Sequence, residues 1–395
     1  MSEWKTYKLG EIVDVLGDGI HGTPIYNEVG DYYFINGNNL GEGYIKIKEN
    51  TLKVDEKEYL KHKKNLTNRT LLLSINGTLG NVAKYRGEPC VLGKSACYLN
   101  ISESCERDFI YYIMISPLFR RDLENMATGT TIKNVSLKAL RNYEISLPPL
   151  AEQKRIADIL SAIDDKIELN RRINANLEQQ AQALFDEIMS CELEYDLIAN
   201  IPHVIETGKR PKGGVASITS GIPSIGAENI KGLGYYDYSK TKFITEEFAT
   251  TLKKGFVNGY ELLIYKDGGK PGYFIPNFSI FGNGFPYNKM ALNEHVFLLD
   301  FRNKGYNFFA YFYFQQEKIM RYLNAQGSKA AIPGINRNDI ENISIPTIQN
   351  KVIQDFCRQT ENIITHILNN ASESRKLSIV RDTLLPKLMS GEITV

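Results

Sequence analysis

Short apolar runs, separated by turns rich in Gly and Asn, alternate along this chain with longer helical patterns. The short runs have the length and composition of β-strands, and they lie at residues 32–35, 71–75, 96–101, 262–265 and 295–300. Helical patterns follow near residues 109–126 and 307–325. The pattern therefore predicts small α+β domains, each with a twisted and mainly antiparallel sheet.

A seven-residue apolar repeat runs through two further stretches and predicts two long coiled-coil helices. The first seam comprises Ile156, Leu160, Ile163, Ile167, Asn170, Asn174, Leu177, Leu184 and Ile188. The second comprises Ile363, Ile367, Asn370, Ser374, Leu377, Leu384 and Leu388. Polar residues interrupt both seams at one level. There a buried amide would reject a slipped register, or alternatively the helices splay and these residues face solvent.

The chain also repeats itself. Residues 129–148 are echoed by residues 327–346 at an offset of 198, and residues 184–193 match residues 384–393 at an offset of 200. A weaker match at an offset of 190 joins residues 71–77 to residues 261–267. We therefore interpret the chain as two copies of one unit, each a globular domain followed by a long helix.

This repeat sets the expected domain boundaries. They are a first domain over residues 1–148, a first helical region over 149–193, a second domain over 194–346 and a second helical region over 347–395. Each helix would span roughly 40 residues, or about 60 Å. If the two helices pack antiparallel, a pseudo-two-fold axis relates the copies and the coiled coil holds the two domains at a fixed separation.

Composition and charge narrow the possible chemistry. The 395 residues are 43% apolar and 24% charged, which excludes a wholly disordered chain. There is no apolar run long enough for a membrane span and no signal-peptide pattern, so we expect a cytoplasmic protein. The net charge is only +1, and residues 149–200 carry 5 basic against 11 acidic side chains. If such a chain binds nucleic acid, we expect a partner to supply many of the phosphate contacts.

The motifs of catalysis and metal binding are not found in the sequence. The five cysteines and five histidines form neither a C-x-x-C pair nor an i, i+4 pair, so we expect no metal site. The segment 87–95 has five residues between its glycines where a phosphate-binding loop needs four. The segment 147–150 lacks the amide of the N-P-P-Y/F methyltransferase signature. We therefore expect a non-catalytic chain that holds no cofactor.

Loops with short amides, hydroxyls and cations occur at equivalent places in the two copies, and such groups are suited to contact base edges in a DNA groove. In the first copy the candidates are His21, Thr23, Asn36, Asn38, Asn39, Asn76, Thr78, Thr130, Thr131 and Lys133. In the second copy they are Lys209, Arg210, Lys212, Lys266, Lys270, Ser328 and Lys329. The two sets differ, as expected if each domain recognises a different sequence. Taken singly, such residues are also typical of ordinary turns.

Taken together, these features resemble the specificity subunit of type I restriction–modification systems. The segment 147–160 (LPPLAEQKRIADIL) is similar to the opening of that family's first conserved region. Residues 4–12, 128–132 and 384–393 also resemble the family. The second copy departs from the pattern, because residues 346–351 (PTIQNK) lack the Pro-Pro and Glu-Gln pairs.

The resemblance implies a non-catalytic subunit with two target recognition domains, each of which recognises one half of a bipartite, asymmetric site in double-stranded DNA. It implies that the coiled coil sets the spacer and docks two modification (methyltransferase) subunits, with Leu150, Glu152 and Gln153 at the contact. Restriction subunits, which act as an ATP-dependent translocase and nuclease, would join them. S-adenosylmethionine, ATP and Mg are expected on these partners.

Three alternatives stay open. The chain could serve a fused methyltransferase–nuclease partner, which the sequence does not distinguish from separate subunits. It could be a coiled-coil adaptor that does not bind DNA. An independent DNA enzyme is the third alternative, and the lack of a recognisable catalytic loop counts against it.

Overall fold

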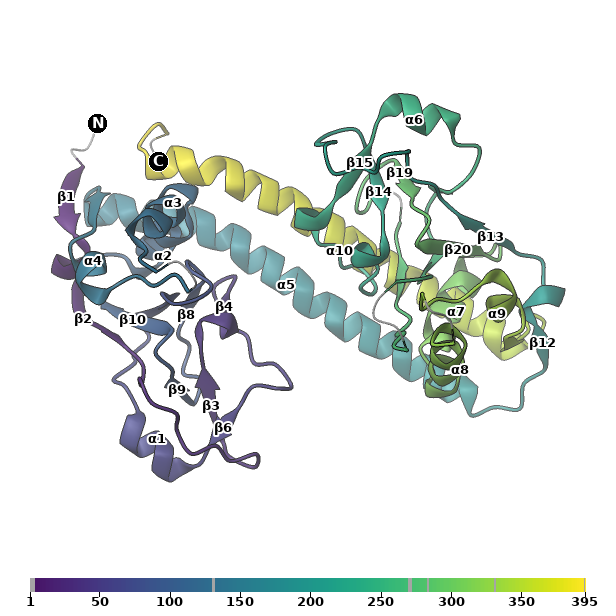
Figure 1. Cartoon of the computed structure of the whole chain (residues 1–395), viewed down its shortest axis with the longest axis horizontal. Coiled ribbons are helices and arrows are strands. Elements are labelled where there is room, and N and C mark those ends of the chain that lie inside the picture. Colours follow the sequence, from purple (N-terminus) through teal and green to yellow (C-terminus); the bar gives the residue numbers. More distant parts are fainter. Residues whose placement is uncertain (1–3, 130–131, 269–271, 283, 330–331, 394) are drawn as a thin grey trace. The chain divides into compact units, whose positions relative to one another are not determined.

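The computed structural model describes residues 4–129, 132–268, 272–282, 284–329, 332–393 and 395 (Figure 1). The chain divides into two compact units. The first is formed by Met1–Asp165 and Ser378–Val395, and the second by Lys166–Leu377. Each unit combines small sheets with helices, which confirms the expected α+β class with a repeated domain and long helices.

The first unit is built on a four-stranded antiparallel sheet with the order β2-β10-β7-β8. Its strands are β2 (Val13–Asp18), β7 (Thr70–Ser74), β8 (Val82–Lys84) and β10 (Ala96–Ile101). A smaller sheet has the order β6-β3-β9, and its β3–β9 pair is parallel. The remaining strands are β1 (Lys5–Lys8), β3 (Tyr32–Ile35), β4 (Leu40–Gly41), β5 (Tyr44–Ile45), β6 (Lys53–Val54), β9 (Cys90–Leu92) and β11 (Glu144–Leu147). Strand β1 pairs with β11, and β4 pairs with β5.

The second unit repeats this topology. Its main sheet has the order β13-β20-β17-β18, a second sheet has the order β15-β14-β19-β16, and β12 pairs with β21. These strands are β12 (Tyr195–Leu197), β13 (Val204–Thr207), β14 (Ile222–Ile225), β15 (Lys242–Ile244), β16 (Phe256–Val257), β17 (Leu262–Tyr265), β18 (Phe278–Ile280), β19 (Met290–Leu292), β20 (Val296–Asp300) and β21 (Ser344–Pro346). The β14–β19 pair is parallel, like β3–β9 in the first unit.

The helices also correspond. The first unit has α1 (Glu56–His62), α2 (Arg107–Ile115), α3 (Pro117–Met126) and α4 (Leu137–Arg141). The second has α6 (Glu246–Thr251), α7 (Lys304–Phe314), α8 (Glu317–Gly327) and α9 (Arg337–Glu341). The helical stretch expected at 109–126 is broken in two, because Pro117 lacks an N–H and occupies the first turn of α3 while Ser116 Oγ accepts from the Phe119 N–H at 3.2 Å.

Backbone hydrogen bonds correct the alignment of the two copies. The Val135 N–H donates to the Ile75 carbonyl, and the Ile335 N–H donates to the Lys266 carbonyl. Val135 is therefore equivalent to Ile335, 200 residues later, and Ile75 is equivalent to Lys266, 191 residues later. The sequence offsets of 198 and 190 are wrong in these segments. The sequence alignment followed the similar segments 145–148 (ISLP) and 343–346 (ISIP), which are 198 residues apart. The N-caps of α4 and α9, Ser136 and Asn336, are 200 residues apart. The two similar segments therefore lie two residues out of step with the structural equivalence.

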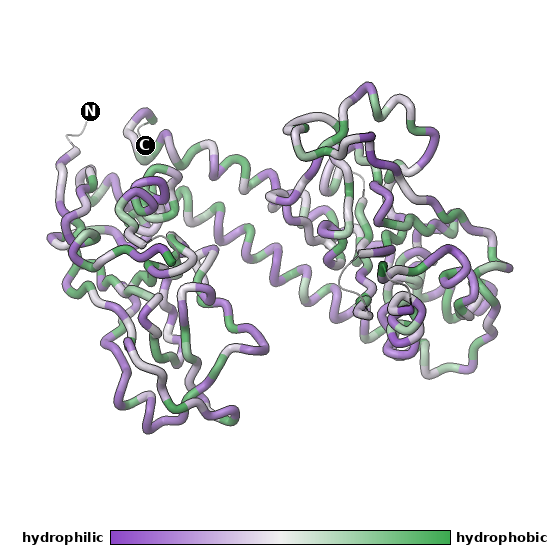
Figure 2. The backbone as a smooth tube through the Cα atoms, in the orientation of Figure 1, coloured by the Kyte–Doolittle hydropathy of each residue, from purple (hydrophilic) through white to green (hydrophobic). Residues whose placement is uncertain are grey.

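Two long helices, α5 (Leu150–Met189) and α10 (Lys351–Met389), contribute to both units. In the first unit Ile156 and Leu160 are buried in one cluster with Leu385 and Leu388. In the second unit the lower numbers of α10 meet the higher numbers of α5, since Phe185 and Phe356 have ring centroids 6.1 Å apart. Within each unit the two helices are therefore antiparallel. Their alternating apolar and polar positions are visible in Figure 2.

The predicted seam residues are all buried or half-buried. In the second unit a polar layer interrupts the seam. Asn170 Nδ2 donates to Glu373 Oε2 at 2.7 Å and Asn370 Nδ2 donates to Asn174 Oδ1 at 2.9 Å. Asn170 is only 1% exposed, so its amide lies between the helices and the solvent-facing alternative does not hold at this position. Helix α10 also buries Ile364 and Leu368 beside the predicted seam, because the second domain packs on a further face of this helix.

Candidate nucleic-acid interface

In the first unit the predicted loops meet at one edge of the sheets. Strands β2, β3, β7 and β9 end there and β10 begins there. Backbone hydrogen bonds join their ends, from Ile20 N–H to the Leu92 carbonyl at 2.8 Å and from Gly93 N–H to the Ile35 carbonyl at 2.8 Å. The Gly77 N–H donates to the Lys133 carbonyl at 3.0 Å and ties the last loop to the same edge. We call this the first loop edge.

The second unit has an equivalent edge, where β13, β14, β17 and β19 end and β20 begins. The Asn293 N–H donates to the Ile225 carbonyl at 2.9 Å, as Gly93 does to Ile35 in the first unit. The Gly268 N–H donates to the Pro333 carbonyl at 2.9 Å, as Gly77 does to Lys133. We call this the second loop edge. The sequence prediction that the candidate loops occupy equivalent places therefore agrees with the backbone.

A glycine stands where each edge begins, because two backbone segments cross there. A Cβ on Gly19 would lie 2.1 Å from the Leu92 carbonyl oxygen, and a Cβ on Gly208 would lie 1.6 Å from the Leu292 carbonyl oxygen. Any side chain at these positions would force the crossing apart. The loops 20–23 and 209–214 thus leave their sheets in a fixed direction.

The first loop edge carries mainly neutral hydrogen-bonding groups. His21, Thr23, Asn38, Thr78 and Lys133 are exposed. His21 Nε2 lies 2.8 Å from Asp18 Oδ2. These side chains can reach a ligand without unfolding the loop.

Other candidates on this edge are engaged within the protein. Asn76 Nδ2 donates to Asn134 Oδ1 at 3.1 Å, and Ser95 Oγ donates to Asn36 Oδ1 at 2.9 Å. Asn39 is buried, and its Oδ1 accepts from the Asn36 N–H at 3.0 Å to close a 3-10 turn. Asn229 does the same for Gly226 in the second unit, so Asn39 has a structural task and we remove it from the candidate surface. Thr130 and Thr131 lie outside the described residues.

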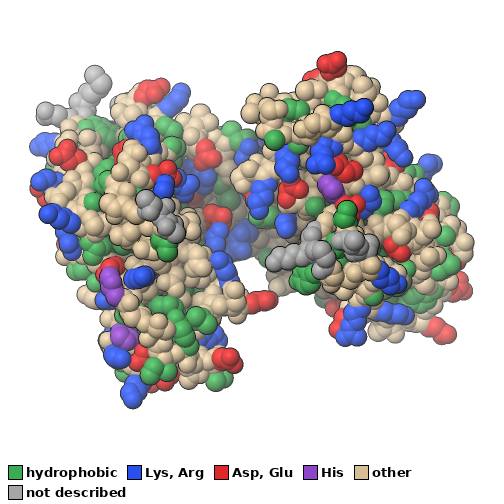
Figure 3. Space-filling view, in the orientation of Figure 1, with side chains coloured by type: hydrophobic (Ala, Val, Ile, Leu, Met, Phe, Trp, Pro, Cys, Tyr) green, Lys and Arg blue, Asp and Glu red, His purple; other side chains and the backbone are tan. Residues whose placement is uncertain are grey.

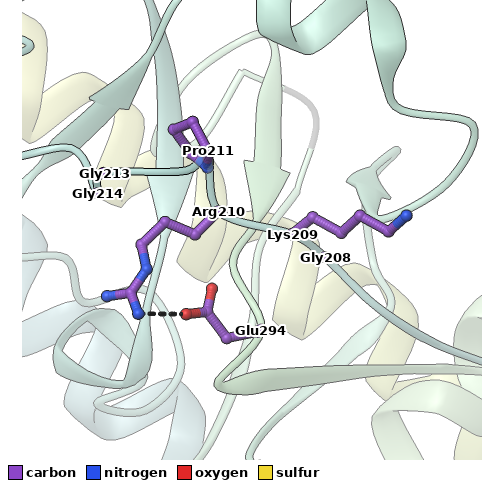
Figure 4. A pocket seen from close by; sticks show the side chains of 7 residues that line it. All are labelled: Gly208, Lys209, Arg210, Pro211, Gly213, Gly214 and Glu294. Atoms are coloured by element: carbon purple, nitrogen blue, oxygen red, sulfur yellow. Dashed lines mark ion pairs between the residues drawn. The ribbon is translucent and has the colours of Figure 1, made fainter.

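The second loop edge carries a chain of charges instead. Arg210 Nη2 lies 2.9 Å from Glu294 Oε1 and borders a cavity of about 660 Å³ with Gly208, Lys209, Pro211, Gly213 and Gly214 (Figure 4). Glu294 Oε1 also lies 3.3 Å from His295 Nε2, and His295 Nδ1 contacts Asp267. Lys266 Nζ lies 3.1 Å from Asp267 Oδ2. The network fixes the direction of the Arg210 guanidinium. Its N–H groups that do not face Glu294 can donate to a ligand.

The remaining candidates of the second edge are less constrained. Lys209, Lys212 and Lys329 are exposed and Ser328 is half-buried. Lys329 Nζ donates to Gln326 Oε1 at 2.7 Å. Lys270 lies outside the described residues. Lys and Arg side chains gather over β14, β15 and β19 on the face seen in Figure 3.

Sequence reasoning missed the corner that joins the two sheets in each unit. Lys94 and Ser95 turn this corner in the first unit, and Glu294 and His295 turn it in the second, at the 200-residue offset. Extending that offset across β10 and β20 would have found them. The charge is reversed from Lys94 to Glu294, so the two corners offer opposite chemistry to a ligand.

The expected partner contact at the start of α5 is revised. Glu152 and Gln153 are only 6% and 3% exposed. Gln153 Nε2 donates to the Pro148 carbonyl at 2.8 Å, and its Oε1 accepts from the Glu106 N–H at 3.0 Å. Gln153 therefore joins the start of α5 to the start of α2. Leu150 is half-buried.

Two properties of the described residues concern metals and membranes. Within these ranges no group of three or more His, Cys, Asp or Glu residues is placed to hold a metal ion. None of the helices in the described part of the chain is long and apolar enough to cross a membrane.

Known proteins share this organisation. Residues 1–179 match the family model described as the type I restriction modification DNA specificity domain. The chain is 24% identical to the MjaIX type I restriction enzyme specificity subunit of Methanocaldococcus jannaschii, over 100% of this chain and 94% of that protein. It is 21% identical to the HindI specificity subunit of Haemophilus influenzae, over 72% and 77% of the two chains. The crystal structure of a type I system S subunit from M. genitalium has the same fold, with a TM-score of 0.59, 18% identity and coverage of 98% and 96%.

The fold thus defines a class of proteins with two similar α+β domains and two long helices. Over residues 1–179 the chain matches the type I restriction modification DNA specificity domain, and along its whole length it is similar to a type I restriction enzyme specificity subunit.

Proposed function

We propose that this chain recognises a bipartite, asymmetric site in double-stranded DNA, with one half-site bound by each loop edge. The observation that carries this proposal is the pair of equivalent loop edges with different chemistry. The first edge exposes amides, hydroxyls and a histidine, whereas the second holds Arg210 beside Glu294. Arg is suited to pair with guanine and short amides with adenine, so the two edges would select different half-sites.

The same proposal assigns the four segments their tasks. Residues 1–148 and 194–346 would be the target recognition domains, and residues 149–193 and 347–395 the helical regions that set the spacer. The helices would dock two modification subunits, which bring S-adenosylmethionine, and restriction subunits, which bring ATP and Mg. Exposed apolar side chains on the helices, rather than Glu152 and Gln153, support this docking: Ile159, Leu169, Ile173, Ile379 and Val380.

The modest net charge of the chain supports a recognition complex rather than independent binding. Counterion release requires many neutralised phosphates, and a chain of net charge +1 offers little excess for it. In a complex, the modification subunits would provide the missing phosphate contacts. A fused methyltransferase–nuclease partner would serve equally well, since both arrangements need the same recognition and docking surfaces.

The test is to sequence modified bases in DNA from cells that contain this chain together with a type I modification subunit. Cells with the modification subunit alone are the control. We expect a new bipartite motif with methylated adenine only when the chain is present. A co-purifying complex that creates no new motif and does not bind DNA would instead support a coiled-coil adaptor.

A matched pair of variants extends this test. Arg210→Ala should relax selection at one base pair of one half-site, because a bidentate guanine contact contributes about 1–3 kcal/mol of discrimination. Lys133→Ala should leave that half-site unchanged and weaken the other. If Arg210→Ala altered both halves equally, the assignment of one half-site to each edge would be wrong.

The helical regions can be tested through the spacer. Seven residues inserted after Leu177 in α5, with seven after His366 in α10 opposite it, keep the seven-residue period and add about 10 Å of helix. We expect the half-site preferences to be preserved and the preferred spacer to lengthen by about three base pairs at 3.4 Å each. The same insertion between Lys253 and Lys254, in an exposed turn, is the control. An unchanged spacer in the helix variant would contradict the proposal.

A further inference from the structure

Two isoleucine side chains are exposed to solvent at equivalent positions of the two units. Ile132 is 61% exposed and Ile332 is 75% exposed. Each lies three residues before a residue whose N–H donates to the carbonyl that directly follows a strand of the main sheet. These donors are Val135, bonded to Ile75 after β7, and Ile335, bonded to Lys266 after β17. The sequence offset of 198 obscured this correspondence, because it aligns Ile132 with residue 330.

The backbone on either side of each isoleucine is fastened to its loop edge. In the first unit the Thr128 N–H donates to the Asn134 carbonyl at 2.9 Å and the Asn134 N–H donates back to Thr128 at 2.8 Å. In the second unit the Gly334 N–H donates to the Gly327 carbonyl at 2.8 Å. The isoleucines are therefore presented from anchored loops and do not lie on trailing segments.

Some residues are identical or similar in the two copies and others differ. This comparison distinguishes residues that stabilise the core from residues that meet a ligand. Val135 and Ile335 stay aliphatic because both are buried in the core. Exposed positions on the edges have changed, as between Lys94 and Glu294. Ile132 and Ile332 are identical although neither gains burial in its own unit, and exposing an aliphatic side chain to water is unfavourable. A shared ligand that covers both isoleucines explains their retention.

The nature of that ligand follows from the neighbouring residues and from this identity. In sequence, exposed Lys133 adjoins Ile132, and exposed Lys329, whose Nζ donates to Gln326 Oε1, lies three residues before Ile332. Each isoleucine therefore has an ammonium group suited to phosphate nearby in sequence. A side chain that selected a base should differ between the two units, as the other edge residues do. An identical aliphatic side chain is suited to a task that does not depend on sequence.

We propose that Ile132 and Ile332 act as apolar wedges that insert between stacked base pairs, one in each half-site. Aliphatic wedges of this kind partly unstack a base step and bend the duplex. The inference rests on the proposed DNA recognition and adds a shape-dependent contribution, since flexible pyrimidine–purine steps would accept the wedge most readily. Ile132 and Ile332 are then positioning residues for the DNA, and the edge residues recognise the bases.

The test uses the full chain with its modification subunit and duplexes that carry 2-aminopurine at single steps across each half-site. We expect fluorescence to rise at one step per half-site when the complex binds, because unstacking relieves quenching. Ile132→Ala should abolish the rise in the first half-site only, and Ile332→Ala in the second only, each with about a tenfold loss of affinity. Val29→Ala, at a residue that is 89% exposed away from the loop edges, is the matched control.

The other outcomes are distinguishable. If both variants keep the fluorescence change but lose the modification subunit in co-purification, the isoleucines contact protein and the inference is wrong. If replacing thymine by uracil mimics the variants while the fluorescence stays flat, they contact a methyl group and do not insert. If the wild-type complex binds no DNA at all, the proposed function fails first.

Discussion

The two units share one topology and differ in both their cores and their loop edges. In the first unit α2 contributes Phe109, Ile110, Tyr112 and Met114 to the core. In the second unit nearly all of α7 is buried and eight of its eleven residues are aromatic or aliphatic, with Phe309 ringed by other aromatic side chains. The edges differ in the same way, with mainly neutral groups on the first and a charge network on the second.

This difference shows how few positions the topology needs. Gly19 and Gly208 permit the same backbone crossing, and Asn39 and Asn229 close the same turn. Phe109 and Phe309 are fully buried at the same place in each core. Elsewhere the two units have exchanged aliphatic for aromatic and neutral for charged residues, so the surface that meets a ligand can change while the scaffold is kept.

The largest expected effect comes from these equivalent core rings. Phe309→Ala and Phe109→Ala should each destabilise their own unit by about 3–5 kcal/mol, because each removes a fully buried ring and leaves a cavity. We expect Phe309→Ala to cost more, since its ring meets Phe185, Phe356 and Tyr306 within 5.8 Å. Hydrogen exchange of the full chain, analysed peptide by peptide, should locate the loss of protection in one unit for each variant. Equal losses in both units would show a single shared core.

The next effect concerns the polar contacts between each domain and the helices. In the first unit Asp164 accepts from the Tyr112 hydroxyl and from Arg381 Nη1, both at 2.7 Å. Burial acts to lower the pKa of Arg381, but the Asp164 carboxylate raises it above its usual range. Asp164→Ala leaves a half-buried guanidinium without this acceptor and should cost about 2–3 kcal/mol, measured by urea unfolding.

A neighbouring carboxylate gives the control for this variant. Asp165 is exposed on the same helix, so Asp165→Ala should change stability by less than about 0.5 kcal/mol. If the two variants were equally destabilising, the loss would come from helix charge in general, and the specific contact of Asp164 would not matter.

A smaller effect tests whether the two loop edges begin alike. Gly208→Ala places a methyl group 1.6 Å from the Leu292 carbonyl oxygen and should move the loop at a cost of about 1–2 kcal/mol. Binding of the second half-site should weaken and binding of the first should not. Gly19→Ala should give the mirror result, and Gly22→Ala, which meets nothing within 4 Å, should change neither. DNA binding to duplexes with one half-site scrambled separates these outcomes.

The comparison also explains what sequence alone could predict. The strands at 32–35, 96–101 and 262–265 were predicted at their observed bounds, because each is a compact apolar run between turn residues. The two-residue strands β4 and β5 carry no such signal, since their pairing depends on tertiary contacts. The long helices were predictable because a seven-residue period leaves a seam that few other structures bury.

The candidate site was harder to predict, because polar side chains give the same signal whether they face a ligand or the protein. Asn38 and Asn39 are adjacent and chemically identical, yet one is exposed and the other closes a turn. Glu152 and Gln153 have the composition of a surface contact but are buried. Glu294 and His295 were missed because their partners Arg210 and Asp267 are distant in sequence.

The smallest expected effect lies at another contact between a domain tyrosine and α5, in the second unit. Tyr311 OH donates to Glu178 Oε1 at 3.2 Å, and burial raises the pKa of Glu178 although this hydrogen bond acts to lower it. A raised folded-state pKa contributes stability that is complete below the ordinary value near 4.5 and is lost as the pH rises through the folded value. Glu178→Gln keeps the acceptor for Tyr311 and removes the charge. It should therefore raise the Tm at pH 7 by about 2 °C and leave it unchanged at pH 4. A Tm at pH 7 that falls would show that the ionised carboxylate stabilises this contact.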